Sequence, residues 1–486
     1  MDDVRLEQLR QRLTQPLPHP DWEELRAAGN QVVDWIMTHH ATLREQRLGR
    51  YATRDEMETL LREPAPSTGR PFADVLRDVQ EKIAAYSMRV NHPMFLAFVP
   101  GAPTPLSILG DWLTAGLNFF SAVWLEGCGP AQVELIVLDW FRDVIGLPES
   151  TRGLLTSGGS EANLTALLAA RERLTFEERS RAVLYVSELR HLSVDRGARI
   201  MGLRPDQIRA VAADDRFRLS ATVLREEVER DRANGLLPWA VVANAGATNT
   251  GTVDPLVALA DVCTEEKLWL HVDAAYGWAA CLAPQRAGEI VGLDRADSIT
   301  LDPHKWFGQT FEAGCVLVRD GQRLVDTFHL RPDYMQDVEP EHDEVNFADY
   351  SLALTRRFRA LKIWVSVQVL GLDWFRQLAE HSCALAELGQ ELLERAGFEI
   401  LCPRQLSIVC FRYRPAGIDD EDALDRLNLE LVEAIWQTGK AFLSSTRLRG
   451  RVALRFCFIN WRSTADDVTA IIDLMKELGA SLVARE

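Results

Sequence analysis

The sequence has no long hydrophobic run. Nowhere in its 486 residues does an apolar stretch approach the roughly 18–20 residues that a membrane-spanning helix needs. The N-terminal residues, MDDVRLEQLRQR, are charged and do not look like a signal peptide. We therefore expect a cytoplasmic protein with no membrane partner. A chain of this length predicts two or three domains rather than one small core.

Basic residues, cysteine motifs and repeats are also scarce. Only 54 Lys and Arg stand against 71 Asp and Glu, which gives a net charge of −17. This balance disfavours binding to phosphate backbones, so nucleic acid is not expected as a partner. The eight cysteines are scattered without CxxC spacing, which predicts reduced thiols and no metal site. Internal repeats and low-complexity tracts are lacking as well.

Two common nucleotide-binding motifs are missing. The segment TSGGSE at 156–161 precedes a predicted helix, and small residues there let backbone N–H groups converge on an anion. The segment lacks the GK[ST] of a P-loop and the GxGxxG of a dinucleotide fold, which argues against an NTPase or a dehydrogenase. A phosphate site of another kind is the interpretation that we carry forward.

The pattern of the chain divides it into three regions. Residues 1–90 predict amphipathic helices, one of them capped by Asp21, which we expect to pack on another subunit. Residues 91–371 contain alternating strand-like and helix-like runs, which predict right-handed crossovers and a largely parallel sheet. Helices are expected over 111–146 and 350–371. Residues 372–486 predict a smaller α+β domain.

Two short apolar runs, LWLHV at 268–272 and SITL at 298–301, stand just ahead of Asp273 and Lys305. In α/β folds, residues that bind ligands or catalyse reactions often lie at the C-terminal ends of buried parallel strands. The two side chains form either an ordinary ion pair or a cofactor site, in which the lysine forms an imine and the aspartate holds a pyridinium nitrogen. Trp306 and Phe307 next to the lysine predict partial desolvation, which favours the neutral amine.

The order of the motifs resembles that of the group II decarboxylases that use pyridoxal phosphate, most closely the aromatic-L-amino-acid decarboxylases. The segments that carry the resemblance are VVDWI (32–36), HPMFLAF (92–98), SEANLTALLAAR (160–171), HVDAAY (271–276), DPHKW (302–306) and RRFRALKIW (356–364). The resemblance implies an α/β fold, the type I fold of pyridoxal-phosphate-dependent transferases such as aspartate aminotransferase. It also implies a homodimer with shared active sites.

The resemblance assigns four catalytic residues. Lys305 is the Schiff-base lysine, Asp273 pairs with the pyridine nitrogen, and His191 stacks on one face of the cofactor ring. Tyr334 matches a loop tyrosine that acts from the neighbouring subunit, where it would deliver a proton to Cα.

The same resemblance assigns the residues around cofactor and substrate. The cofactor-binding residues are Gly159, Ser160, His191, Thr248, Asp273, Ala275, His304 and Lys305. The expected substrate pocket comprises Phe98, Pro100, Phe120, Ala122 and Thr355. No metal ligand is among them.

The implied reaction is that of a lyase: decarboxylation of an L-amino acid, of the aromatic class, to the amine and CO2 through a Lys305 Schiff base and a quinonoid intermediate. An aldehyde synthase or a transaminase on the same fold is one alternative, and Tyr334 in place of Phe favours the decarboxylase. A catalytically silent binding dimer is an alternative of another class. The presence of Lys305, Asp273 and His191 disfavours it.

Some positions depart from the family pattern. Asp302 replaces an Asn near the phosphate, so we leave it out of the phosphate ligands, and Gly101 replaces a Thr. Thr355 stands where the family has Gly or Ser, which should narrow the pocket and favour a phenyl or phenol ring over indole. Arg455 is expected either to form a salt bridge within the last domain or to approach the substrate carboxylate.

Overall fold

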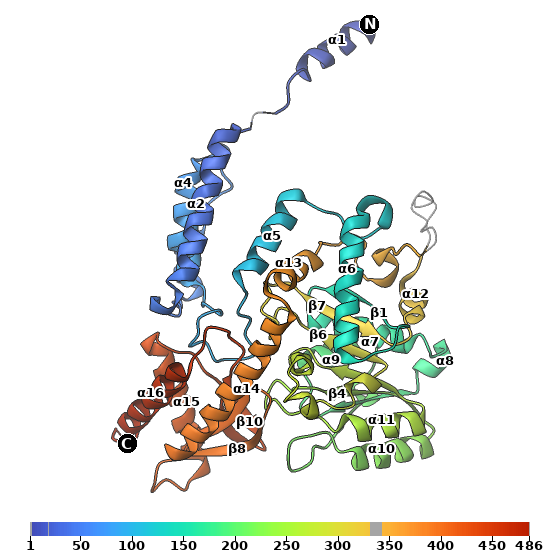
Figure 1. Cartoon of the computed structure of the whole chain (residues 1–486), viewed down its shortest axis with the longest axis vertical. Helices are drawn as coiled ribbons and strands as arrows, with labels where there is room; N and C mark the ends of the chain where they lie inside the picture. The colour runs from blue at the N-terminus through green and yellow to red at the C-terminus, as the bar shows by residue number, and fades with distance from the viewer. Residues whose placement is uncertain (1, 18, 331–342, 486) are drawn as a thin grey trace. The chain divides into compact units, whose positions relative to one another are not determined.

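The computed structural model of the protein describes residues 2–17, 19–330 and 343–485 (Figure 1). Tyr334 lies outside the described residues. The chain divides into two compact units, Met1–Met88 and Arg89–Glu486. No helix of the described residues is long and apolar enough to cross a membrane.

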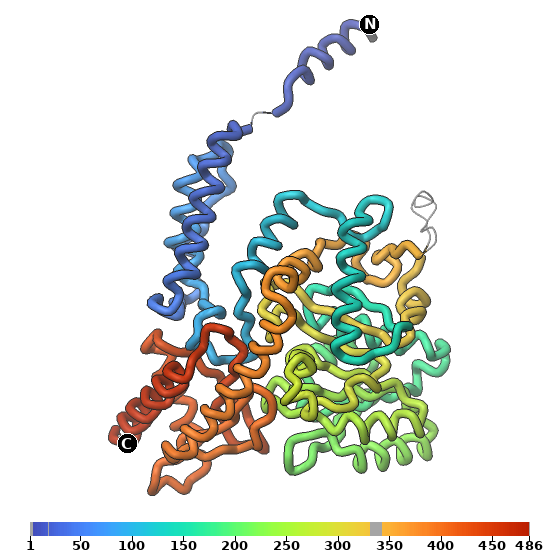
Figure 2. The backbone as a smooth tube through the Cα atoms, in the orientation of Figure 1, coloured from blue at the N-terminus to red at the C-terminus, as the bar shows by residue number. Residues whose placement is uncertain are grey.

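The first unit is helical. Its α-helices are α1 (Asp2–Arg12), α2 (Trp22–Ala41), α3 (Arg54–Leu61) and α4 (Phe72–Asp78). Asp21 caps α2 as expected, since its side chain accepts hydrogen bonds from the backbone N–H groups of Glu23 and Glu24. Figure 2 shows α2 and α4 side by side within this unit.

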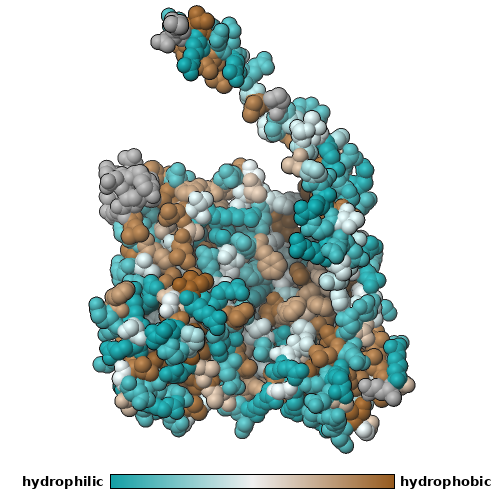
Figure 3. All heavy atoms as spheres, turned by 180° about the vertical axis from the view of Figure 1, so that it is seen from behind, coloured by the Kyte–Doolittle hydropathy of each residue, from teal (hydrophilic) through white to brown (hydrophobic). Residues whose placement is uncertain are grey.

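The helices of the first unit bury few of their own apolar side chains. None of the residues of α2 is buried. Val33 on α2 and Phe72 and Val75 on α4 are all exposed, and hydrophobic side chains lie among hydrophilic ones on the surface of this unit (Figure 3). An amphipathic helix stabilises itself mainly by packing its apolar face, and these faces lack that packing within the unit.

The second unit contains a seven-stranded sheet in the order β1-β7-β6-β5-β4-β2-β3. Its strands are β1 (Arg152–Thr156), β2 (Ala182–Ser187), β3 (Ile208–Val211), β4 (Leu237–Asn244), β5 (Trp269–Asp273), β6 (Ser298–Leu301) and β7 (Gly314–Val318). Strands β6, β5, β4, β2 and β3 run parallel, and β7 is antiparallel to both of its neighbours. The largely parallel sheet expected from the sequence is confirmed.

The helices of this unit that precede the second sheet are α5 (Pro105–Leu117), α6 (Trp124–Ile145), α7 (Gly159–Arg171), α8 (Phe176–Arg179), α9 (Leu192–Ile200), α10 (Ala221–Ala233), α11 (Leu256–Glu266), α12 (Gln322–Phe328) and α13 (Ala360–Leu370). Helix α7 packs against β1, β5, β6 and β7, whereas α10 and α11 lie side by side and pack on β4 (Figure 1). Every residue of β2 and β5 is buried, as a parallel sheet with both faces covered requires.

A second, four-stranded antiparallel sheet follows, in the order β10-β11-β9-β8. It is built from β8 (Phe398–Gln405), β9 (Ile408–Tyr413), β10 (Ser444–Leu448) and β11 (Arg451–Cys457), with α14 (Leu372–Arg395), α15 (Glu421–Thr438) and α16 (Ala465–Val483). The segment around Leu96 joins this layer, because the Leu96 N–H donates to the Phe442 carbonyl and its own carbonyl accepts from the Cys457 N–H.

Two helices expected from periodicity are shorter than predicted. The run over 111–146 is interrupted, because α5 ends at Leu117 and Asn118 adopts a left-handed conformation with φ 47°. The helix expected over 350–371 begins only at Ala360. Just before it, Arg357 forms an isolated antiparallel bridge with Phe120. Tertiary pairing therefore replaces a helical turn that the local sequence pattern allowed.

Candidate functional site

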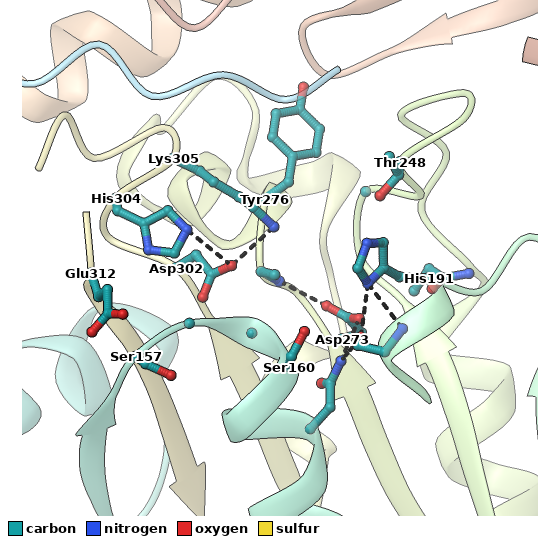
Figure 4. A pocket seen from close by; sticks show the side chains of 17 residues that line it. Ser157, Ser160, His191, Thr248, Asp273, Tyr276, Asp302, His304, Lys305 and Glu312 are labelled. Carbon is teal, nitrogen blue, oxygen red and sulfur yellow. Dashed lines mark hydrogen bonds and ion pairs between the residues drawn. The ribbon is translucent and has the colours of Figure 1, made fainter. Parts of the chain in front are cut away.

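A cavity of about 360 Å3 opens at the C-terminal edge of the parallel strands (Figure 4). Asn244 ends β4, Asp273 ends β5, and Lys305 follows β6 by a short turn. Parallel strands bring their C-terminal ends to one edge of a sheet, which is where ligands of such folds bind. The eight residues expected to hold the cofactor all line this cavity: Gly159, Ser160, His191, Thr248, Asp273, Ala275, His304 and Lys305.

The glycine-serine turn forms one wall of the cavity. Helix α7 starts at Gly159, so the positive end of its dipole and its first N–H groups face the cavity beside Ser160. A Cβ at Gly159 would meet Asp302 Oδ2 at 2.9 Å and Ala275 Cβ at 3.4 Å. Glycine is thus needed here for space, because the turn lies tightly against the loop that follows β6.

Lys305 reaches across the cavity to Asp302. Its Nζ lies 2.9 Å from Asp302 Oδ2, and the aspartate side chain is only 2% exposed. Burial alone favours the neutral amine, but the carboxylates of Asp302 and Asp273 outweigh it and raise the pKa of Lys305. The expectation of a neutral amine was therefore wrong for the protein by itself. Burial does desolvate the lysine, but the sequence did not reveal that a carboxylate pairs with it.

Asp302 has hydrogen-bonding capacity left over. Its Oδ1 is buried and has no hydrogen-bond partner among the described residues. The same holds for Asn244 Nδ2 at the end of β4, and both residues line the cavity. Buried polar atoms are almost always satisfied, so these two indicate a site that is completed by a polar ligand.

Asp273 is held by its neighbours below the cavity floor. Its Oδ2 accepts a hydrogen bond of 2.9 Å from Asn163 Nδ2, and its Oδ1 accepts one of 3.1 Å from the Ala275 N–H. The side chain is 7% exposed. The two donors hold both carboxylate oxygens of Asp273 in a fixed orientation at the end of β5.

His191 stands at the N-terminus of α9, where it serves as the N-cap. Its Nδ1 lies 2.8 Å from Ser193 Oγ and accepts a hydrogen bond of 3.3 Å from the Ser193 N–H. Burial lowers the pKa of His191, while the Asp273 carboxylate opposes that change. The imidazole is thus held by its own helix beside Asp273 (Figure 4).

The expected substrate-pocket residues are not among those that line this cavity. Ala122 is buried and packs with Val123 and Ala348, and Thr355 is exposed. Phe98 is 57% exposed and adopts a left-handed backbone conformation with φ 57°. In this chain none of the five residues Phe98, Pro100, Phe120, Ala122 and Thr355 therefore contributes to the wall of the Lys305 cavity.

Arg455 links Phe98 to the rim of the cavity. Its guanidinium is buried and donates to the backbone carbonyls of Phe98, Thr248 and Asn249 and to Ser444 Oγ. Its contacts in the described residues do not include the salt bridge within the last domain that we expected. The guanidinium instead ties the Thr248 loop to the small sheet.

Sequence reasoning did not assign several residues of the cavity wall to the site. They are Ser157, Asn163, Ser193, Asn244, Tyr276 and Glu312. Asp302, which we left out of the phosphate ligands, also lines the cavity. A signal was present for Asn163, which is the one amide side chain in the apolar helix sequence GSEANLTALLAAR. It lies one helical turn after Gly159, so it faces the same way as the turn that we singled out.

Comparison with known proteins places these features in a family. The family model described as "Pyridoxal-dependent decarboxylase conserved domain" matches residues 55–414. An aromatic-L-amino-acid decarboxylase of Bacillus atrophaeus is 39% identical over 458 residues, which cover 94% of this chain and 95% of that protein. A phenylacetaldehyde synthase of Arabidopsis thaliana is 31% identical, with 90% and 91% covered. Among solved structures, Oryza sativa TDC with PLP and tryptamine superposes with a TM-score of 0.91 at 27% identity and covers 96% of this chain and 99% of its own.

Proposed function

Because this chain belongs to the pyridoxal-dependent decarboxylase family, we propose that the cavity around Lys305 is its active site. The protein is an amino-acid decarboxylase that uses pyridoxal phosphate and acts on an L-amino acid of the aromatic class to give the amine and CO2. One observation carries the assignment of the site. A half-buried amine, a buried carboxylate and a helix N-terminus with a glycine turn converge on one cavity.

The residues present fit pyridoxal phosphate. The cofactor has three features to be held: an aldehyde, a ring nitrogen and a phosphate. The cavity offers an amine at Lys305, a carboxylate at Asp273 and the first turn of α7, each from a different strand end or helix end. The unpartnered Asn244 Nδ2 and Asp302 Oδ1 supply further polar contacts at the wall.

Each residue then has a distinct task. Lys305 would hold the aldehyde carbon of the bound cofactor, and Asp273 would keep a proton on its ring nitrogen. His191, Ala275 and Thr248 would contact the ring. Gly159, Ser160 and His304 would hold the phosphate, where the α7 dipole favours negative charge.

The chemistry follows from these positions. When bound, pyridoxal phosphate supplies the electron sink that accepts the electron pair left at Cα when CO2 departs. Asp273, oriented by Asn163 and the Ala275 N–H, would maintain that capacity. His191 would help to orient the reacting carboxylate perpendicular to the ring, which would align the breaking bond. Tyr334 would deliver the proton to Cα.

The first experiment is a turnover assay with a panel of Phe, Tyr, Trp, dihydroxyphenylalanine, His, Glu and Asp, in which CO2, amine, aldehyde and ammonia are all recorded. Equal amounts of CO2 and amine from an aromatic substrate are expected. The Lys305→Ala variant should lose both products and the absorbance of the bound cofactor. Activity retained in that variant would remove Lys305 from the mechanism.

The aldehyde synthase is the second candidate, favoured by the similarity to the phenylacetaldehyde synthase. Aldehyde with ammonia from the panel would establish it. Because Tyr334 is assigned to protonate Cα, the Tyr334→Phe variant should divert product from amine to aldehyde. An unchanged product ratio in that variant would refute the role of the tyrosine.

The substrate preference is proposed from Thr355. A β-branched side chain at this position narrows the pocket, so a phenyl or phenol substrate should be favoured over indole. The Thr355→Gly variant should raise kcat/KM for Trp relative to Tyr by about 10-fold or more, which corresponds to about 1–3 kcal/mol of pocket discrimination. The matched variant Thr355→Ser should give a smaller change in the same direction.

We also propose a cytoplasmic homodimer with shared sites, with domains over 1–90, 91–371 and 372–486. The exposed apolar side chains of the first unit support a partner surface. The absence of Phe120, Ala122 and Thr355 from the wall of the Lys305 cavity supports sites completed by a second copy.

Mixed dimers test this arrangement directly. Lys305→Ala and Tyr334→Phe are each expected to lack amine formation alone, but they are altered in different halves of one shared site. When the two are unfolded together and refolded, a fraction of the dimers should carry one intact site and regain amine formation. Refolded mixtures without any recovered activity would contradict a shared site.

A further inference from the structure

A chain of hydrogen bonds runs beneath the cavity from β5 and β6 to α7 and α9. Trp269 Nε1 donates to Ser298 Oγ at 2.8 Å, and Ser298 Oγ lies 2.9 Å from His271 Nδ1. His271 Nε2 lies 3.0 Å from Asn163 Oδ1. The chain continues through Asn163 to Asp273 and Ser193. Its polar members are at most 7% exposed: Asn163, Ser193, His271, Asp273 and Ser298.

The hydrogen bond to Asp273 fixes the orientation of Asn163. The carboxylate of Asp273 accepts from the Asn163 side chain, and only the NH2 group of an amide can donate. Because Asp273 faces Asn163 at 2.9 Å, the Asn163 NH2 group must point toward it. The Asn163 oxygen therefore faces His271, which must donate from Nε2.

Burial lowers the pKa of His271 to about 4, so the imidazole is neutral near pH 7 and its one proton lies on Nε2. Its Nδ1 then accepts from the Ser298 hydroxyl, whose oxygen accepts from Trp269. His271 thus supplies the N–H that Asn163 Oδ1 accepts.

The second N–H of Asn163 fixes the other branch. It donates to Ser193 Oγ at 2.9 Å, so the Ser193 hydroxyl is free to donate to His191 Nδ1 at 2.8 Å. The Ser193 backbone N–H points to the same nitrogen. A nitrogen that faces two donors is an acceptor, so the single proton of neutral His191 resides on Nε2.

We propose that Asn163 is a positioning residue that couples the two sides of the cofactor site: its NH2 group orients the carboxylate of Asp273 and, through Ser193, holds His191 as the Nε2–H tautomer. The inference rests on the proposed function, because it concerns the residues assigned to the cofactor ring. It adds two residues, Asn163 and Ser193, that neither motif nor resemblance singled out.

Other charges face this pair of residues and set the background of any pH effect. Lys305, Asp302 and Arg196 act on His191 besides Asp273. Asp302 and Asp273 both act on Lys305. These groups are the same in variants of Asn163, so their contribution cancels when a variant is compared with the wild type at each pH.

The Asn163→Asp variant tests the first branch. It has the same shape, but it places a carboxylate where the NH2 group lay 2.9 Å from Asp273. Two carboxylates this close must share a proton, which is lost as pH rises. We expect the ratio of the variant's Kd for pyridoxal phosphate to that of the wild type to grow from about pH 6 to about pH 9, by on the order of 10- to 100-fold for a hydrogen bond to a charged group. Tryptophan fluorescence of the purified full chain measures both constants.

The Ser193→Ala variant tests the second branch without any cofactor. Deuterium exchange at imidazole C2, followed by mass spectrometry, reports the protonation of each histidine. Without the hydroxyl donor at Nδ1, the midpoint for His191 should move to higher pH. Ser366→Ala, which removes another buried serine hydroxyl, on α13, is the matched control and should leave His191 unchanged.

The results separate a failure of the proposed coupling from a failure of the proposed function. A pH-independent Kd ratio for Asn163→Asp, or an unmoved His191 midpoint in Ser193→Ala, would overturn the coupling. Failure of the wild type to take up pyridoxal phosphate would instead overturn the proposed function, and the exchange measurement on His191 would still judge the hydrogen-bond chain. If Asn163→Asp does not fold, the Ser193→Ala result decides alone.

Discussion

A buried ion pair between Glu134 and Arg356 gives the sharpest prediction about stability near the site. The side chains are 0% and 1% exposed, and Arg356 Nη2 lies 2.5 Å from Glu134 Oε1. The carboxylate also accepts from the Leu155 N–H at 2.8 Å, and the guanidinium donates to the carbonyls of Leu155 and Ser121. The pair therefore ties β1, just before the glycine-serine turn, to the segment that carries Ala122.

The size of the expected loss of stability follows from the burial of the two charges. Removing one partner of a buried ion pair leaves the other charge uncompensated, which costs about 3–5 kcal/mol. Glu134→Gln should therefore lower the local stability of β1 by about that amount. The double variant Glu134→Gln with Arg356→Met should lose clearly less than the sum of the two single variants, since it removes both charges.

Hydrogen exchange of the peptide that covers Arg152–Thr156, read by mass spectrometry, measures this opening free energy. The surface pair Asp373–Arg376, with side chains 79% and 46% exposed, provides the control. Asp373→Asn should change its own helix by less than about 1 kcal/mol. A loss under about 1 kcal/mol for Glu134→Gln, or strictly additive double-variant losses, would refute the reasoning.

Other expectations follow from single contacts. Asp302→Asn removes a carboxylate that raises the pKa of Lys305. The rate of pyridoxal phosphate uptake at neutral pH should therefore rise by roughly 10-fold or more, because a hydrogen bond to a charged group contributes about 1.5–3 kcal/mol. Absorbance of the bound cofactor measures this rate. Burial lowers the pKa of His271 from 6.5 to about 4. The folded state then binds fewer protons than the unfolded state in that window, so stability falls as pH drops through it, by about 3 kcal/mol in total. Urea denaturation of wild type and His271→Gln should show a shallower acid loss in the variant. Arg455→Met removes four donated hydrogen bonds and should increase proteolysis of the loop around Thr248, whereas equal cleavage rates would exclude a tethering role.

The strands that carry the site could be read from the sequence because their pattern is local. The buried runs ahead of Asp273 and Lys305 correspond to β5 and β6, and β6 has the predicted limits Ser298–Leu301. A parallel sheet covered on both faces demands continuous apolar strands, so such runs are recognisable without knowing their neighbours. The glycine-serine turn was equally readable, because its role depends on the helix that directly follows it.

Helix limits near the site were less predictable for a physical reason. The apolar spacing of 350–371 suits a helix throughout, yet α13 starts at Ala360. The Arg356 side chain is buried and forms an ion pair with Glu134, which is more than two hundred residues away in the sequence. No local pattern records a partner at that distance, and a buried charge determines the backbone path more strongly than helix propensity does.

The sequence by itself determined the residue types that meet at the sheet edge: a lysine, an aspartate, a histidine and a glycine-serine turn, each placed by a local strand or helix signal. Only the tertiary structure decided how these groups are charged and oriented. Asp302 pairs with Lys305, and Asn163 joins Asp273 to Ser193 and so to His191. Protonation depends on burial and on charges within a few ångströms, and those distances exist only once the strands and helices have packed.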